Sequence, residues 1–144
     1  PKNPQHEFGH LWEYPLRSVC TISTHDMATL RGWWEEDPAL TARYYNQVLG
    51  QWGEVPVTAP GWACEEIVRQ HLQCPSLLCI LAFQDWLSMD EDLRYPDANA
   101  ERINVPANPR HYWRYRMHLT LEDLMKNKAF NKKMTEMIDE AGRY

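Results

Sequence analysis

The first residues that could carry chemistry are in the run His6-Glu-Phe-Gly-His10, which fits the pattern H-E-x-x-H. In zinc peptidases this pattern lies on one helix, where both histidines bind the metal and the glutamate is the general base. Here the surrounding prolines and glycine leave room for about one helical turn. The sequence therefore favours a loop in which His6 and His10 make hydrogen bonds. A zinc hydrolase using His6, Glu7 and His10 is the alternative.

A second candidate is the dipeptide His25-Asp26, which directly follows the β-rich run 19–24. A carboxylate beside an imidazole at a strand end could stabilise positive charge developing on a sugar ring, or hold the hydroxyl groups of a sugar. A capping or turn role for Asp26 explains the same dipeptide equally well, because aspartate is common in turns.

Aromatic side chains supply a third kind of candidate. Trp33 and Trp34 follow Arg31, and tryptophan faces can stack on sugar rings or on a guanidinium. Packing of these indoles between a helix and a sheet is the alternative. The run Tyr112-Trp-Arg-Tyr-Arg116 resembles a stacking platform for nucleic acid. The net charge of −5 argues against that use, because binding to phosphates needs a basic surface.

Two further classes of protein are disfavoured by composition. No apolar run reaches the roughly 18 residues of a membrane span. The four cysteines, at positions 20, 64, 74 and 79, lie in apolar segments without C-x-x-C spacing. We therefore expect free, buried thiols in a cytoplasmic protein and no disulfide framework.

These residues need secondary structure to position them, and the sequence alternates between strand and helix patterns. The β-rich run 19–24 and the run 76–83, which is apolar on both faces, predict buried strands, and the second is followed by Gln84-Asp85. Asp37-Pro38 predicts a helix start that continues to about Gly50. A second helix is expected over about 62–73. Polar residues 88–111 predict a long, functional loop.

The chain is predicted to turn helical from Tyr112 to its C-terminus, with Thr120 as a helix N-cap. Apolar residues at helical spacing predict a core-facing stripe, made of Leu121, Leu124, Met125, Phe130, Met134, Met137 and Ile138. Two strand-and-helix units cannot form a stable parallel sheet alone, and a complete (β/α)₈ barrel takes about 250 residues. The pattern therefore predicts two of eight such units.

Several segments together resemble one family. Residues 18–37, from Ser-Val-Cys-Thr-Ile-Ser-Thr-His-Asp to Asp37, are similar to the segment that carries the third catalytic carboxylate of 4-α-glucanotransferases, family 77 of the glycoside hydrolases. Gln84-Asp85-Trp-Leu, Ile103-Asn-Val-Pro-Ala-Asn-Pro109 and His111-Tyr-Trp-Arg-Tyr-Arg116 follow in the order of the family. The last segments look closer to the plant cytosolic disproportionating enzymes and their bacterial relatives than to the short amylomaltases.

This resemblance implies a retaining transfer of α-1,4-glucan segments or glucosyl units from maltose or maltooligosaccharides to acceptor glucans. It implies no metal or organic cofactor, and no partner beyond these sugars. Asp26 would be the third carboxylate, which holds ring hydroxyls and favours the distorted sugar. Substrate-binding roles would fall to His25, Asn104, Trp33, Trp34, Gln84 and Asp85.

No segment matches the family's motifs for the nucleophilic aspartate or the acid/base glutamate. We therefore expect residues 1–144 to be the C-terminal part of the catalytic barrel, with about the last two strands and the closing helices. Such a fragment would be inactive alone and prone to self-association through uncovered strands. A non-catalytic carbohydrate-binding fragment is the other reading.

Overall fold

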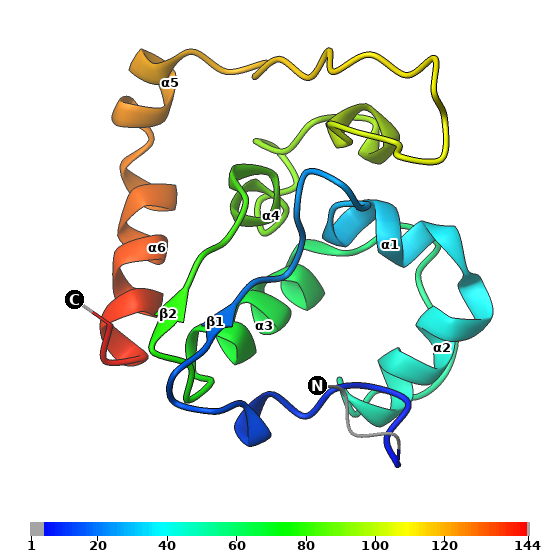
Figure 1. Cartoon of the computed structure of the whole chain (residues 1–144). Helices are drawn as coiled ribbons and strands as arrows, with labels where there is room; N and C mark the ends of the chain where they lie inside the picture. Colours follow the sequence, from blue (N-terminus) through cyan, green and yellow to red (C-terminus); the bar gives the residue numbers. More distant parts are fainter. Residues whose placement is uncertain (1–4, 144) are drawn as a thin grey trace.

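The computed structural model describes residues 5–143 and contains both helices and strands (Figure 1). The elements in chain order are the 3₁₀ turn η1 (Leu11–Glu13), β1 (Val19–Cys20), α1 (Leu30–Glu36), α2 (Pro38–Gln47), α3 (Gly61–Leu72), β2 (Leu78–Cys79), α4 (Phe83–Leu87), the 3₁₀ turn η2 (Ala98–Glu101), α5 (Leu121–Lys126) and α6 (Lys128–Glu140).

The two strands form a small parallel sheet in which Val19 pairs with Leu78 and Cys20 with Cys79. The parallel arrangement agrees with the predicted strand-and-helix pattern, but both strands are much shorter than predicted. Beyond Cys20 the chain bends, and the Thr21 hydroxyl donates to the Ser23 carbonyl at 2.8 Å. The predicted second strand was also wrong at its end, because Phe83 begins α4.

Most helix predictions in the middle of the chain are confirmed. Asp37 caps α2 by accepting hydrogen bonds from the amides of Ala39 and Leu40, and Pro38 occupies the first turn. Helix α3 matches the predicted range 62–73 closely. Helix α1 was not predicted, because its seven residues are too few for a clear apolar periodicity.

The C-terminal part departs further from prediction. Residues 112–119 are not helical, and Figure 1 shows this stretch crossing the molecule in extended form to reach α5. Helix α5 starts where predicted, since the Thr120 hydroxyl accepts from the Asp123 amide at 3.1 Å. In the predicted stripe Phe130 and Met137 are buried, whereas Leu121 and Met125 are exposed and were wrongly assigned to the core.

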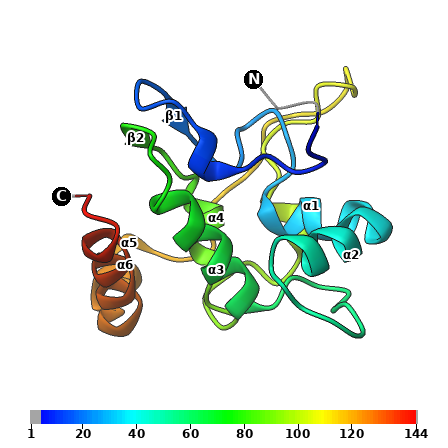
Figure 2. The same cartoon turned by 90° about the horizontal axis from the view of Figure 1, so that it is seen from below.

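Helix α3 lies between the two sides of the molecule, with α1 and α2 on one side and α5 and α6 on the other (Figure 2). Its Ile67 belongs to a core cluster with Trp34 and Tyr45, and its Val68 belongs to a second cluster with Phe130. At its first residue, a Cβ on Gly61 would come within 2.8 Å of the Met89 carbonyl oxygen. Glycine therefore lets α3 approach the start of the long loop.

The predicted state of the cysteines is largely confirmed. All four thiols are free, with Cys20, Cys64 and Cys74 buried and Cys79 half-buried. Residues 88–111 form the predicted long loop, interrupted by η2. Within residues 5–143 no helix has both the length and the apolar content needed to span a membrane.

Candidate functional site

Three of the predicted site residues meet in the turn after β1. The Asn104 side-chain amide donates to Asp26 Oδ1 at 2.7 Å, and His25 Nε2 lies 3.2 Å from Asp26 Oδ2. The Asn104 backbone amide also donates to the His25 carbonyl at 3.1 Å. The long loop is thus tied by side chain and backbone to a dipeptide 78 residues earlier. Both carboxylate oxygens of Asp26 have a polar neighbour.

This group is open to solvent. The side chains of His25 and Asp26 are each 54% exposed. The indole of Trp113, which is 62% exposed, lies with its ring centroid 5.2 Å from that of His25. An exposed aromatic face beside a carboxylate, an imidazole and an amide is a combination suited to a sugar ring and its hydroxyls.

The position of Trp113 beside His25 was not predicted, although its segment was noted. The aromatic and arginine run 112–116 was considered only as a nucleic-acid platform. In the structure Arg114 lies over the Tyr112 ring at 5.2 Å, and Trp113 reaches the His25 side chain. The sequence could have indicated a site role for Trp113 only through the resemblance of residues 111–116 to the family.

Asp85 fixes the base of the turn that carries His25 and Asp26. It is completely buried, accepts from the Ser23 hydroxyl at 2.5 Å and accepts from the Leu30 amide at 2.9 Å. These bonds hold the two ends of the segment 23–30 against α4. Asp85 therefore positions this turn from the interior.

Glu101 provides the second anchor, between η2 and α1. Its carboxylate accepts from Arg31 Nη1 at 2.6 Å and from the Thr29 hydroxyl at 3.0 Å, and its carbonyl accepts from the Gln84 side chain at 3.3 Å. Arg31 also donates to the Tyr95 carbonyl at 2.6 Å. This network places Asn104, three residues later, next to Asp26. Gln84 is buried in the network, so it too supports the turn.

Burial controls the electrostatics of both anchors. Desolvation raises the pKa of Asp85, and the hydrogen bonds from Ser23 and Leu30 oppose that rise. Desolvation likewise raises the pKa of Glu101, against the opposing effect of the Arg31 guanidinium. Each acid has hydrogen-bond donors that compensate its removal from water.

We predict that Asp85→Ala lowers the free energy of unfolding by about 1–3 kcal/mol, because the Ser23 hydroxyl and Leu30 amide lose their buried acceptor. Asp85→Asn, which keeps an acceptor, should cost less. The pKa of Asp85 is higher in the folded protein than in the unfolded chain. Its contribution to stability therefore falls as the pH rises from the unfolded-state pKa through the folded-state pKa. Urea unfolding should therefore show a smaller deficit for Asp85→Asn as pH rises over that window, and a constant deficit would contradict this account.

The two tryptophans of α1 lie in the core or against α2. Trp34 is 1% exposed, and its indole nitrogen donates to the Pro56 carbonyl at 2.9 Å. This burial corrects the prediction that Trp34 offers a stacking surface. Trp33 is half-buried and packs edge-on against Tyr44, with ring centroids 5.1 Å apart. Trp34 therefore packs in the interior, which is the alternative to sugar stacking, and Trp33 keeps only part of its surface exposed.

The run from His6 to His10 is a loop, as predicted, and its histidines have polar contacts. His10 Nδ1 lies 3.3 Å and His6 Nε2 3.9 Å from the same oxygen, Glu13 Oε1. Glu7 does not lie with them, because its carboxylate accepts from Arg43 Nε at 2.9 Å. A zinc hydrolase with Glu7 as general base does not fit this arrangement, and the helix that its motif needs is absent from residues 5–10.

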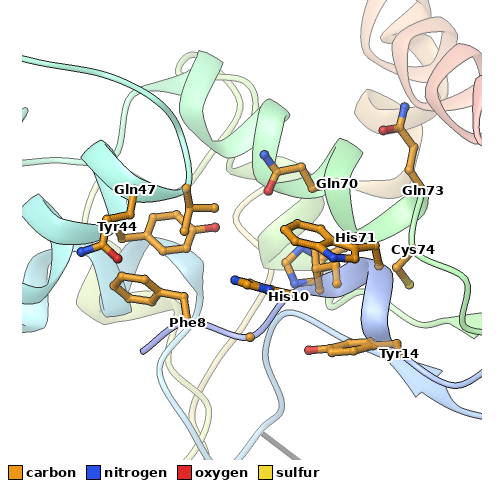
Figure 3. Close-up of a pocket in the computed structure, with 13 residues that line it drawn as sticks. Phe8, His10, Tyr14, Tyr44, Gln47, Gln70, His71, Gln73 and Cys74 are labelled. Atoms are coloured by element: carbon orange, nitrogen blue, oxygen red, sulfur yellow. The ribbon is translucent and has the colours of Figure 1, made fainter. Parts of the chain in front are cut away.

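A separate cavity of about 540 Å³ lies between the N-terminal segment and helices α2 and α3 (Figure 3). Its walls carry mostly aromatic and apolar side chains, among them Phe8, Trp12, Tyr14, Tyr44 and His71. Of the residues predicted to bind sugar, from His25 and Asp26 to Asn104, none lines it, whereas His10 does. The polar group around Asp26 and this apolar cavity are therefore two distinct features.

Comparisons with known proteins agree on one family. A family model described as 4-alpha-glucanotransferase matches residues 1–121. The 4-alpha-glucanotransferase DPE2 of Oryza sativa subsp. japonica is 38% identical over 143 residues, which is 99% of this chain and 15% of the rice protein. A 4-alpha-glucanotransferase of Chlamydia caviae is 31% identical over 131 residues, 90% of this chain and 24% of that protein.

A similar fold occurs in a solved structure, the amylomaltase of Streptococcus agalactiae in complex with acarbose. The TM-score is 0.64 at 21% sequence identity, and the match covers 90% of this chain and 23% of that one. The chain thus spans less than a quarter of the length of each of these three relatives.

Proposed function

Since the chain belongs to the 4-alpha-glucanotransferase family, we propose that it forms part of an enzyme that moves α-1,4-glucan segments or glucosyl units between sugars with retention. The donors would be maltose and maltooligosaccharides, and the acceptors glucans. The observation that carries the proposal is the group around Asp26, in which an exposed carboxylate lies between His25 and Asn104 and beside Trp113.

Retention requires a nucleophilic carboxylate and an acid/base carboxyl group about 5–5.5 Å apart, with an oxocarbenium-like transition state. We assign neither role to Asp26. Its role would be to accept hydrogen bonds from ring hydroxyls and to favour the distorted, positively charged sugar. Asn104 holds one carboxylate oxygen, so Asp26 is oriented before substrate arrives. His25 would donate to the same sugar, and Trp113 would stack on a neighbouring ring.

The nucleophile and the acid/base group would come from other parts of a (β/α)₈ barrel, with this chain as its C-terminal portion. The parallel pairing of β1 and β2 and the site after β1 support this placement, because barrel active sites lie at the carboxyl ends of the strands. Apolar side chains at and beside both strands are exposed, as expected where further strands and helices would cover them. In an isolated 144-residue chain the same surfaces would promote self-association.

We also propose a cytoplasmic location for the protein. The four free thiols fit this location, because disulfides form mainly in oxidising compartments.

The proposal predicts that the full-length protein containing this segment converts maltotriose into a ladder of longer and shorter glucans. The 144-residue chain alone should produce none. The measurement is product analysis by chromatography, with maltooligosaccharide titration of the isolated chain. Failure of the full-length protein to form the ladder would refute the proposal. Transfer by the isolated chain would refute the missing-carboxylate argument, and tight sugar binding without any transfer in the full-length protein would favour a carbohydrate-binding function.

A further inference from the structure

We propose that His6, His10 and Glu13 bind a zinc ion that is separate from the Asp26 site. One ligand atom from each of the three residues lies within 4.8 Å of the other two. The two imidazole nitrogens converge on a single carboxylate oxygen, at 3.3 Å from His10 Nδ1 and 3.9 Å from His6 Nε2. The three residues therefore form a compact set of two nitrogen donors and one oxygen donor.

This donor set fits zinc better than the hard cations. Zinc takes imidazole nitrogen and carboxylate oxygen in tetrahedral sites, whereas magnesium and calcium are bound by oxygen. Donors at about 2.0–2.1 Å from a tetrahedral ion stand roughly 3.3 Å apart. The separation from His10 Nδ1 to the Glu13 oxygen already matches this value, and the separation from His6 Nε2 is 3.9 Å. The ligand atoms all lie within 4.8 Å of one another, so the set closes around the ion by a movement of roughly 1.5 Å at most. Water would complete the fourth position.

The surroundings hold the ligands in place before a metal arrives. The rings of His6 and His10 are half-buried, with centroids 3.8 Å apart, and the other face of His10 contacts Trp12 at 4.4 Å. Phe8, between the two histidines, packs edge-on against Tyr44 of α2 at 5.1 Å. The loop is therefore fastened to α2 at its centre, which lowers the entropy cost of closing the ligand set.

Glu7 shows why the expected zinc-peptidase arrangement does not form. Arg43 of α2 binds its carboxylate, with Nη2 at 2.8 Å from Oε1, and so orients it toward α2. Glu13, at the end of η1, faces the histidines in its place. The ion would close the loop from residue 6 to residue 13 over the aromatic cavity, and its fourth position would stay open to water.

Figure 3 shows His10 among the side chains that line this cavity, together with Phe8, Tyr14 and Tyr44. Residues 8–12 form one wall, so a bound ion would fix that wall against α2 and α3. No step of glucan transfer passes through this site. Zinc binding and transfer activity are therefore independent readouts.

The test is a zinc titration of the metal-free full-length protein by calorimetry, compared with Glu13→Gln, His10→Ala and Glu7→Gln. We expect one zinc ion per chain at this site, and at least a tenfold loss of affinity in Glu13→Gln and His10→Ala, since each removes one of the three protein ligands. Glu7→Gln is the matched control from the same loop and should bind zinc as the wild type does. Zinc should also raise the melting temperature of the wild type but not of Glu13→Gln.

Equal zinc affinity in wild type, Glu13→Gln and His10→Ala would overturn the proposal, as would the absence of zinc binding in the wild type. A loss in Glu7→Gln as large as in Glu13→Gln would overturn the assigned ligand set. Circular dichroism of each variant establishes that it is folded, and Glu13→Gln should keep the wild-type transfer rate.

Discussion

Asp26→Asn in the full-length protein should lower kcat for glucan transfer by about 100- to 1,000-fold, with a much smaller change in KM. Asparagine keeps the shape and the hydrogen-bonding capacity toward Asn104, but it removes the negative charge. That charge interacts most strongly with the positive sugar of the transition state and only weakly with the neutral ground state. Its removal therefore falls on kcat rather than on binding.

Asp92→Asn is a suitable control for this experiment. Asp92 is an exposed aspartate of the long loop, and the same change of charge there should leave both kinetic constants close to wild type. Steady-state disproportionation of maltotriose, followed by glucose release, gives both constants. A wild-type kcat in Asp26→Asn would remove Asp26 from the catalytic machinery, and a lowered melting temperature would point to a folding role instead.

The composition of the candidate site could be predicted only where local patterns or the family resemblance reached it. His25 and Asp26 were found because polar residues follow a strand pattern. Asn104 was found through the resemblance, since nothing local links it to a residue 78 positions earlier. Trp113 was not assigned, because an aromatic residue in an irregular segment has the same local signature whether it packs, stacks or binds.

The predictions that failed depended on long-range contacts. After Ser76 the run to Phe83 is apolar at every position, and such a pattern cannot distinguish a long strand from a two-residue strand followed by a bend and a helix. Trp33 and Trp34 are neighbours of the same type, and only the fold decides that Trp34 is the buried one, with its indole nitrogen bonded to the Pro56 carbonyl. Glu101 stands in a polar loop and would be expected in solvent, yet Arg31 holds it in the interior.

Arg31→Met should lower the free energy of unfolding by about 3–5 kcal/mol, because it breaks the buried ion pair with Glu101. The side chains of Arg31 and Glu101 are only 5% and 2% exposed, and their charged atoms are 2.6 Å apart. Methionine fills similar space but leaves the Glu101 carboxylate buried without its cation. The Tyr95 carbonyl loses a hydrogen-bond donor at the same time.

The deficit should also depend on pH. Without Arg31, the pKa of Glu101 rises further above its ordinary value, because the guanidinium no longer opposes the effect of burial and only the Thr29 hydroxyl does. A group whose pKa is raised on folding loses its contribution to stability as pH rises through that pKa. The deficit of Arg31→Met relative to wild type should therefore be smaller in mild acid than at neutral pH.

Urea unfolding at several pH values, followed by far-ultraviolet circular dichroism, measures both effects. Arg43→Met is the matched control, since Arg43 pairs with Glu7 at the surface and water solvates whichever partner is left. Its unfolding midpoint should stay close to wild type. Equal, small effects of the two substitutions would mean that Glu101 finds other partners, and the loop carrying Asn104 would then be positioned without the buried ion pair.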